Sequence, residues 1–254
     1  MQRRRRRYAR RIMLVAPEYT DASQVASDLR GRGYAIVSPG GMQELTGCTA
    51  SELDALLPAW DNLPLDTFLR DGGKYRRRRH SCFVVQDGAV VQAPHRAHWQ
   101  PVDYNALHGG LRRWFEPMLV PEDQCATWAR ILQGLGALFS QLRGARPWYV
   151  EAHQFRIETT GGIGRPTPEG AHRDGVSFVA VFLLARRDIK GGETRVFDAH
   201  GPGGQRFTLQ QPWSLLLLDD ERVIHETTPV QPTGPAGWRD TLVLTYREGG
   251  FQGG

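Results

Sequence analysis

Two residue types that bind metals stand two positions apart at His172 and Asp174. Residues i and i+2 of an extended chain point to the same face, so these two side chains project together. A further histidine, His225, ends a short run that contains valine and isoleucine. Two imidazoles and one carboxylate form the facial ligand set of non-haem Fe(II) oxygenases, which leaves open positions for substrates and O₂. The pattern therefore predicts a metal centre at His172, Asp174 and His225.

An H-x-D pair alone is a weak signal, because such pairs also occur in turns and caps. The residues that follow strengthen it. Arg239 and Thr241 open the last long β run and share its parity, and a guanidinium beside a hydroxyl suits the distal carboxylate of a small dicarboxylate. Gly191 and Gly192, between the two histidines, predict a tight turn that enters a strand. The order of these motifs predicts a co-substrate site at Arg239 and Thr241.

In this order the motifs resemble those of the Fe(II)/2-oxoglutarate-dependent dioxygenases. More narrowly, the chain is similar to the bacterial branch that contains free L-amino-acid (L-isoleucine-type) hydroxylases and biofilm-stress-and-motility (BsmA-like) proteins. Beyond the triad, the resemblance rests on residues 166–175 (PTPEGAHRDG), 217–220 (LLDD), 238–240 (WRD) and 153–156 (HQFR), and less specifically on 75–79 (YRRRR). These motifs run from about residue 75 to residue 247.

The resemblance implies a double-stranded β-helix, or jelly roll, in which His172, Asp174 and His225 hold Fe(II). It implies that 2-oxoglutarate chelates the iron through its keto-acid end and that Arg239 receives its distal carboxylate. The expected reaction is O₂-dependent hydroxylation of a small molecule, a free L-amino acid, with release of succinate and CO₂. It also associates the chain with biofilm formation and stress response.

The elements around these motifs predict a mainly β fold with flanking helices. After Pro147, short runs rich in valine, phenylalanine, leucine and threonine alternate with turn residues, as is typical of a jelly roll. The expected strands are residues 149–158, 177–184, 193–198, 206–209, 213–218, 222–226 and 241–246.

The first 145 residues predict helices at 20–30, at 49–59 behind a Thr49–Glu52 capping box, and from Pro121 to about Gly144, with a strand at 34–37. We expect these helices to pack on one outer face of the sheet. Since no linker rich in proline, glycine or serine interrupts the chain, residues 13–254 are expected to form one domain, with a β-helix core at about 148–248.

Substrate contacts are predicted on the strand that begins the β-rich half. Gln154 and Arg156 alternate with Phe155 and Ile157, so one face of that strand is polar. If the polar face lines the barrel, Gln154 and Arg156 bind a substrate carboxylate or amine; otherwise they form a stripe that faces solvent. The loop 161–170, rich in glycine and proline, is either a lid over the iron or an inert surface loop.

Positive charge is concentrated at the start of the chain. Seven arginines lie within residues 2–11, and removing them lowers the formal charge from +5 to about −2. This basic arm, residues 1–12, is expected to be disordered because it has almost no apolar surface to bury. Its single aromatic residue, Tyr8, disfavours nucleic acid as a partner. The second basic run, residues 76–79, fits either a phosphate-binding patch or an arginine-rich loop or strand edge paired with carboxylates.

The remaining composition is that of an ordinary globular protein, with 40% hydrophobic and 23% charged residues. Cys48, Cys82 and Cys125 match neither a disulfide framework nor a zinc-site spacing, which favours a reducing compartment. No apolar run approaches the ~18 residues of a membrane helix, and none suits a signal-peptide core. We therefore expect a cytoplasmic protein with no membrane partner; homo-oligomer formation stays open.

Three alternatives remain. A catalytic zinc site can use the same triad in a hydrolase, although a hydrolase has no special need for Arg239 and Thr241. A metal-binding jelly-roll module can act in stress response or sensing without turnover, although its triad is intact. The third alternative is demethylation of nucleic acid or protein by the same oxygenase chemistry.

Overall fold

The computed structural model describes residues 14–105, 107 and 109–253, so the predicted basic arm lies outside the described residues. Helices dominate the first part. They are the 3-10 turns η1 (Ala22–Gln24), η2 (Leu57–Trp60) and η3 (Glu122–Gln124) and the α-helices α1 (Val25–Arg32), α2 (Pro39–Thr46), α3 (Ala50–Asp54) and α4 (Cys125–Arg143). The strands of this part are β1 (Tyr34–Val37), β2 (Arg76–Gln86) and β3 (Ala89–Gln92).

The second part of the chain is almost entirely strand. Its elements are β4 (Trp148–Glu158), β5 (Phe178–Arg187), β6 (Ile189–Gly191), β7 (Thr194–Asp198), β8 (Gly204–Phe207), β9 (Leu215–Asp219), β10 (Val223–Thr227), β11 (Val230–Pro232) and β12 (Trp238–Arg247). All seven strands predicted here are present, with ends shifted by a few residues. The short β6 and β11 were not predicted.

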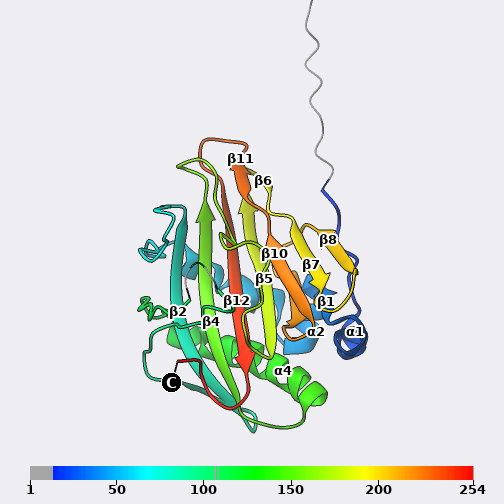
Figure 1. Cartoon of the computed structure of the whole chain (residues 1–254). Coiled ribbons are helices and arrows are strands. Elements are labelled where there is room, and N and C mark those ends of the chain that lie inside the picture. The colour runs from blue at the N-terminus through cyan, green and yellow to red at the C-terminus, as the bar shows by residue number, and fades with distance from the viewer. Residues whose placement is uncertain (1–13, 106, 108, 254) are drawn as a thin grey trace, which may run out of the picture.

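The strands form three antiparallel sheets. The major sheet has the order β1-β9-β5-β12-β4-β2-β3, and smaller sheets β10-β7-β8 and β11-β6 lie on its opposite side from the helices (Figure 1). The helices α1, α2 and α4 cover the other face of the major sheet. This arrangement confirms the prediction of a mainly β jelly roll with a helical N-terminal part packed on one face.

Two hydrophobic cores hold the layers together. The larger core lies between the helices and the major sheet, where Phe139 of α4 stacks on Phe178 of β5 with ring centroids 4.2 Å apart. The smaller one, which includes Val179, Phe207 and Leu216, lies between the major and minor sheets. Because successive side chains of a strand alternate, each central strand contributes one face to the helices and one to the space between the sheets.

Local signals set several element boundaries. Thr49 and Glu52 form the predicted capping box, but α3 ends at Asp54 and the chain continues as η2 instead of one helix to residue 59. Pro58 has no N–H to donate to an α-helical ladder. Gly33 ends α1 in the left-handed conformation, with φ 80°.

The arginine run 76–79 begins β2, an interior strand between β3 and β4. All four side chains pair with carboxylates: Arg76 and Arg78 with Asp66, at 2.7 and 4.0 Å, Arg77 with Glu158, and Arg79 with Glu116. The run therefore pairs with carboxylates, as the second alternative has it, but it lies in an interior strand and not in a loop or at a strand edge.

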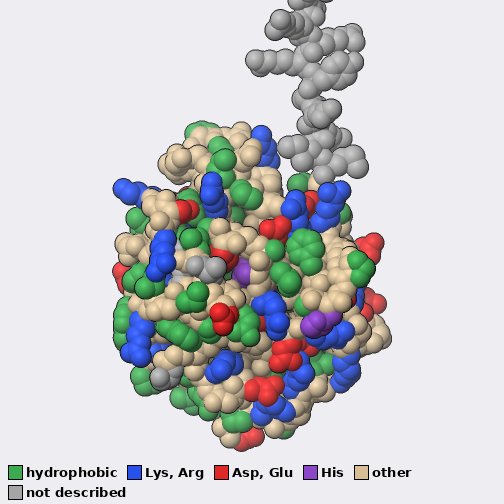
Figure 2. Space-filling view, viewed as in Figure 1, with side chains coloured by type: hydrophobic (Ala, Val, Ile, Leu, Met, Phe, Trp, Pro, Cys, Tyr) green, Lys and Arg blue, Asp and Glu red, His purple; other side chains and the backbone are tan. Residues whose placement is uncertain are grey.

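Basic and acidic side chains are interspersed over the face of the molecule seen in Figure 2, with no single large basic patch there. Within the described part of the chain, no helix has the length and apolar character needed to cross a membrane.

Candidate active site

The three predicted metal ligands converge between the major and minor sheets. His225 lies in the middle of β10, and the extended segment at His172 pairs with it through two backbone hydrogen bonds of 3.0 Å. Oδ1 of Asp174 is 3.8 Å from Nε2 of His172, and its Oδ2 is 3.8 Å from Nε2 of His225. Two ligands that are each about 2.1 Å from one metal lie at most about 4.2 Å apart, so these distances suit a shared ion.

The protons of the histidines also fit metal binding. Nδ1 of His172 lies 2.9 Å from the carbonyl oxygen of Gly170, which can only accept a hydrogen bond. The proton is therefore on Nδ1, and the Nε2 lone pair is free for a metal. Burial and the neighbouring His172 lower the pKa of His225 well below its usual value, which keeps it in the neutral, ligating form.

Asp220, directly after β9, holds the loop that carries Asp174. Its carboxylate accepts hydrogen bonds from the backbone N–H groups of Asp174, Gly175 and Val176 at 3.0, 2.8 and 3.1 Å. Burial and the nearby Asp174 raise the pKa of Asp220 to about 7. The sequence motif 217–220 contained this residue, but only the fold shows that it positions a metal ligand.

The triad faces a cavity of about 130 Å³. The wall includes the cavity faces of β2, β4 and β12 and the segment between β3 and α4. On β12 the lining residues are Arg239, Thr241, Val243, Thr245 and Arg247, which follow one another at every second position. The shared parity predicted for Arg239 and Thr241 is thus present, and both lie in the same cavity as the triad.

The surroundings of Arg239 suit an anion. This side chain is 3% exposed, and its buried Nη2 has no hydrogen-bond partner. Burial and the neighbouring Arg186 lower its pKa to about 10, so it stays charged at neutral pH. A Cβ at Gly192 would lie 3.6 Å from Cδ of Arg239 and 3.3 Å from Nη1 of Arg186. The glycine turn predicted from the sequence therefore leaves room for two guanidinium groups.

The two predicted substrate residues do not line this cavity. Arg156 forms two hydrogen bonds with Asp240, of 2.8 and 2.7 Å, and the fully buried Gln154 has no partner for its side-chain amide. The alternate residues of β4, among them Glu151 and His153, face the cavity instead. This face of β4 packs toward the helices, so it neither lines the cavity nor forms a stripe that faces solvent.

In the loop 161–170, the cavity is lined by Pro166, Thr167 and Glu169. Oε1 of Glu169 is 3.6 Å from Nε2 of His172, and its buried Oε2 has no hydrogen-bond partner. This part of the loop therefore contributes a carboxylate next to the triad.

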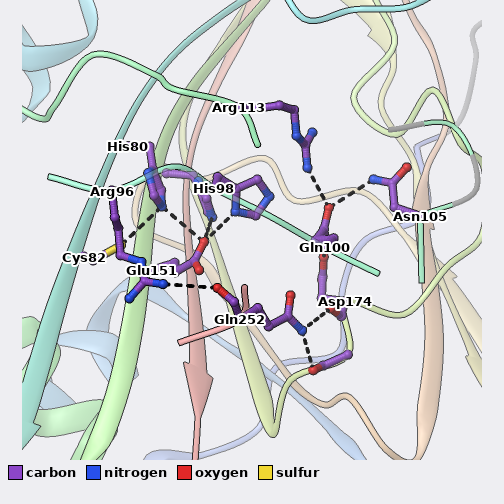
Figure 3. Close-up of polar contacts among 12 residues, drawn as sticks. His80, Cys82, Arg96, His98, Gln100, Asn105, Arg113, Glu151, Asp174 and Gln252 are labelled. Carbon is purple, nitrogen blue, oxygen red and sulfur yellow. Dashed lines mark hydrogen bonds and ion pairs between the residues drawn. The ribbon is translucent and has the colours of Figure 1, made fainter. Parts of the chain in front are cut away.

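A second histidine cluster, which the sequence did not predict, lies beside the same cavity. His80 of β2, His98, and Glu151 and His153 of β4 are all buried, with ligand-type atoms within 4.8 Å of one another. Nε2 of His80 and Nδ1 of His98 are 3.1 and 2.5 Å from Oε2 of Glu151 (Figure 3). We call these four residues the His–Glu cluster.

The proton positions in the His–Glu cluster do not suit a metal. Nη2 of Arg78 is 2.7 Å from Nδ1 of His153, and a guanidinium can only donate, so Nδ1 accepts and the proton lies on Nε2. That Nε2 is directed at Oε2 of Glu151, 3.8 Å away. Burial lowers the pKa of His98 to about 4, so its neutral ring donates to the carboxylate. The cluster thus presents N–H groups around an anion.

One side chain links the metal ligand Asp174 to Arg113. Gln100 accepts a hydrogen bond from Nη2 of Arg113 and donates one to Oδ1 of Asp174, both of 3.1 Å. Figure 3 shows Gln100 between Arg113 and Asp174. A chain of polar side chains therefore runs from the metal ligands toward the His–Glu cluster.

Comparison with known proteins places this site in a family. The model of the 2OG-Fe dioxygenase family matches residues 57–245, which include the triad, Arg239 and the His–Glu cluster. The chain belongs to the 2OG-Fe dioxygenase family. It is accordingly a dioxygenase whose cofactors are Fe(II) and 2-oxoglutarate, and the fit of His172, Asp174 and His225 to a metal ion agrees with this.

Solved structures extend the likeness over nearly the whole chain. A bsmA homolog from Methylobium petroleophilum is 51% identical, with a TM-score of 0.87 over 93% of this chain and 97% of that one. IDO from Bacillus thuringiensis is 15% identical, with a TM-score of 0.67 over 94% and 100% of the two chains, and the dioxygenase TqaL is 19% identical, with a TM-score of 0.62 over 89% and 86%. The latter two share the fold. No curated protein matches this chain.

Proposed function

We propose that this dioxygenase hydroxylates a free L-amino acid, with consumption of O₂ and 2-oxoglutarate and release of succinate and CO₂. One observation carries the substrate class: the cavity at the triad has buried side chains of both charges, Arg113 (2% exposed) and Glu151 (7% exposed). Buried charges are costly unless they are paired. A zwitterion of small size supplies a partner for each.

In this proposal His172, Asp174 and His225 hold Fe(II), and Arg239 and Thr241 bind the distal carboxylate of 2-oxoglutarate. The bound iron and 2-oxoglutarate supply the oxidising chemistry. The protein's own residues position it: Asp220 fixes the backbone of the Asp174 loop, and the largely buried cavity wall excludes water from the reacting groups.

Two further assignments belong to the proposal. The 51% identity to a bsmA homolog supports a place in the BsmA-like branch, and with it a part in biofilm or stress physiology. The free thiols of Cys48, Cys82 and Cys125 support a cytoplasmic location, because a reducing compartment keeps thiols unpaired.

The test is a succinate-release screen of the twenty amino acids with Fe(II), 2-oxoglutarate and O₂. We expect one or a few amino acids to raise succinate above the substrate-free rate and to gain one oxygen atom, as measured by mass spectrometry. Succinate formation that no amino acid stimulates would refute the substrate class.

The same assay separates the alternatives. A zinc hydrolase would consume no 2-oxoglutarate, a sensing module would bind it without forming succinate, and a demethylase would release formaldehyde from a methylated polymer.

A further inference from the structure

We infer that the His–Glu cluster and the arginines beside it recognise the head group of the substrate. Arg78 and Arg113 bind its carboxylate, and Glu151 binds its ammonium group. This inference rests on the proposed function and deepens it, because it assigns the amino-acid head group to named residues and leaves the side chain to face the iron.

Arg78 and Arg113 each have a buried N–H donor without a hydrogen-bond partner. Arg78 and Arg113 are 3% and 2% exposed, both line the cavity, and the buried Nε of each has no hydrogen-bond partner. A buried N–H without a partner costs free energy. Nη2 of Arg113 donates to Gln100, a neutral amide, so this contact leaves its charge uncompensated.

The charged groups around Arg113 also leave it available to an anion. Three buried guanidinium groups, those of Arg76, Arg78 and Arg113, face the carboxylates of Asp66 and Glu151, and Glu169 also acts on Arg113 from the cavity wall. Asp66 is already engaged by Arg76, at 2.7 Å. Burial lowers the pKa of the histidines of the cluster, so they add no charge at neutral pH. Among the described residues no carboxylate makes an ion pair with Arg113, so its guanidinium is available to a substrate carboxylate.

Glu151 is held as an anion with one oxygen left over. His80 and His98 both donate to its Oε2. Burial opposes ionisation, but the two histidines keep the pKa of Glu151 below its usual value. Among the described residues no hydrogen bond reaches its Oε1, and Glu151 lines the cavity. A carboxylate oxygen on the cavity wall is a suitable acceptor for an ammonium group.

The guanidinium of Arg78 and the carboxylate of Glu151, which we assign to the two ends of the head group, are neighbours. A single imidazole ring, that of His153, separates the guanidinium of Arg78 from the carboxylate of Glu151. In an α-amino acid one carbon atom separates the two head groups. Arg78 is held in place by Phe115 and Phe155, whose ring centroids are 3.8 and 4.5 Å from its Cζ. The adjacency of the two sites therefore matches a zwitterionic head group better than two separate ligands.

The position of the head-group site relative to the triad determines which end of the amino acid reacts. Gln100 alone bridges Arg113 and the metal ligand Asp174. A substrate whose carboxylate lies at Arg113 thus has its head group about one amide side chain from the iron ligands. The C–H bonds that reach the iron are then those of the amino-acid side chain.

The test compares Arg113→Met, Arg78→Met and Glu151→Gln with the control Arg79→Met. Arg79 is the neighbour of Arg78 on β2, does not line the cavity, and donates to the carbonyl oxygens of Pro117 and Asn62. We expect the KM for the amino acid to rise ten- to hundredfold in the first three variants, as for a lost charge-assisted contact, and less than about twofold in the control. The KM for 2-oxoglutarate should change less than about threefold in all four.

Two measurements distinguish recognition from structural support. Anaerobic calorimetry with Mn(II) and 2-oxoglutarate measures amino-acid binding without turnover, and the unfolding midpoint reports whether each variant is folded. Analogues then give a signature that misfolding cannot produce. Arg113→Met should lose the preference for the amino acid over the corresponding amine, and Glu151→Gln the preference over the corresponding deaminated acid.

Three results would overturn the inference. In the first, amino acids are turned over but the cavity variants have the same KM as Arg79→Met, and the proposed function survives. In the second, a deaminated acid is the better substrate of the wild type, which also refutes the proposed function. In the third, the wild type binds two metal ions per chain and His153→Phe binds one, which would make the His–Glu cluster a metal site.

Discussion

Two clusters of histidines and a carboxylate lie in the described part of the chain, and they differ in the positions of the imidazole protons. In the triad, the carbonyl of Gly170 accepts from Nδ1 of His172 and leaves Nε2 as a lone pair. In the His–Glu cluster, Arg78 donates to Nδ1 of His153 and forces the proton onto Nε2. The same residue types therefore present electron pairs in one place and N–H donors in the other.

The difference shows that neighbours outside a cluster decide its chemistry. A carbonyl oxygen behind a histidine prepares it for a metal, and a guanidinium in the same position prepares it to donate to an anion. The carboxylates differ in the same way. Asp174 contacts two Nε2 atoms at 3.8 Å, a spacing that leaves room for an ion, whereas Glu151 is bonded directly by His98 at 2.5 Å.

The largest effect is expected from exchanging each carboxylate for its amide. Asp174→Asn should weaken iron binding by more than about a hundredfold, since even changes behind a metal ligand cost 10- to 100-fold, and should abolish succinate formation. Glu151→Gln should keep one iron per chain. Metal content after dialysis checks both. Equal iron loss in the two variants would contradict the distinction between the clusters.

The next effect concerns Arg239, which lines the cavity of the triad. Arg239→Leu should weaken 2-oxoglutarate binding about ten- to a hundredfold, because charge-assisted hydrogen bonds contribute on the order of 1.5–3 kcal/mol each, while metal affinity stays nearly unchanged. Arg247→Leu is the control, since Arg247 lines the same cavity but donates to the carbonyl of Gly250. Calorimetric titration with 2-oxoglutarate measures both. A loss in Arg247→Leu alone would reassign the carboxylate site.

A smaller effect on iron affinity is expected from Asp220, which holds the loop that carries Asp174. Asp220→Asn replaces one of the two oxygens that accept three backbone N–H groups, so the Asp174 loop should loosen and iron affinity fall by about tenfold. Asp219→Asn is the matched control, since Asp219 pairs with Arg143 instead. Competition with a chelator measures the affinity. No difference between the two variants would mean that Asp220 does not position the ligand.

The smallest effect is a pH dependence of stability from the His–Glu cluster. The pKa of His98 is about 4 in the folded protein and about 6.5 in the unfolded chain. Between these values the unfolded state binds more protons, so His98 contributes stability that is complete above pH 6.5 and declines as the pH falls toward 4. From pH 7.5 to 5.5 this loss is about 1 kcal/mol. His98→Gln removes the titrating ring, and urea unfolding of this variant should show a loss smaller by that amount; an identical pH profile would contradict a neutral His98.

The sequence by itself determined the features that depend on local pattern and on the order of motifs. The capping box at Thr49 and Glu52 and the shared parity of Arg239 and Thr241 follow from spacing alone, and the structure contains them. The members of the triad could also be predicted, because two of them are two residues apart and the third lies in a predicted strand. Local geometry and residue type suffice for such features.

The tertiary structure decided which side of each strand is the inside. Gln154 and Arg156 were read correctly as one face of β4, but the helices, not the cavity, lie against that face. Alternation gives two faces, and only the packing partner distinguishes them.

The His–Glu cluster shows the same limit for a site. Its residues come from β2, β4 and the segment that carries His98, so no single sequence motif predicts the complete cluster. Its chemistry depends further on Arg78, which fixes the tautomer of His153 from the next strand. A proton's position on an imidazole is set by what lies beside the ring, and in this protein folding brings those neighbours together from distant parts of the chain.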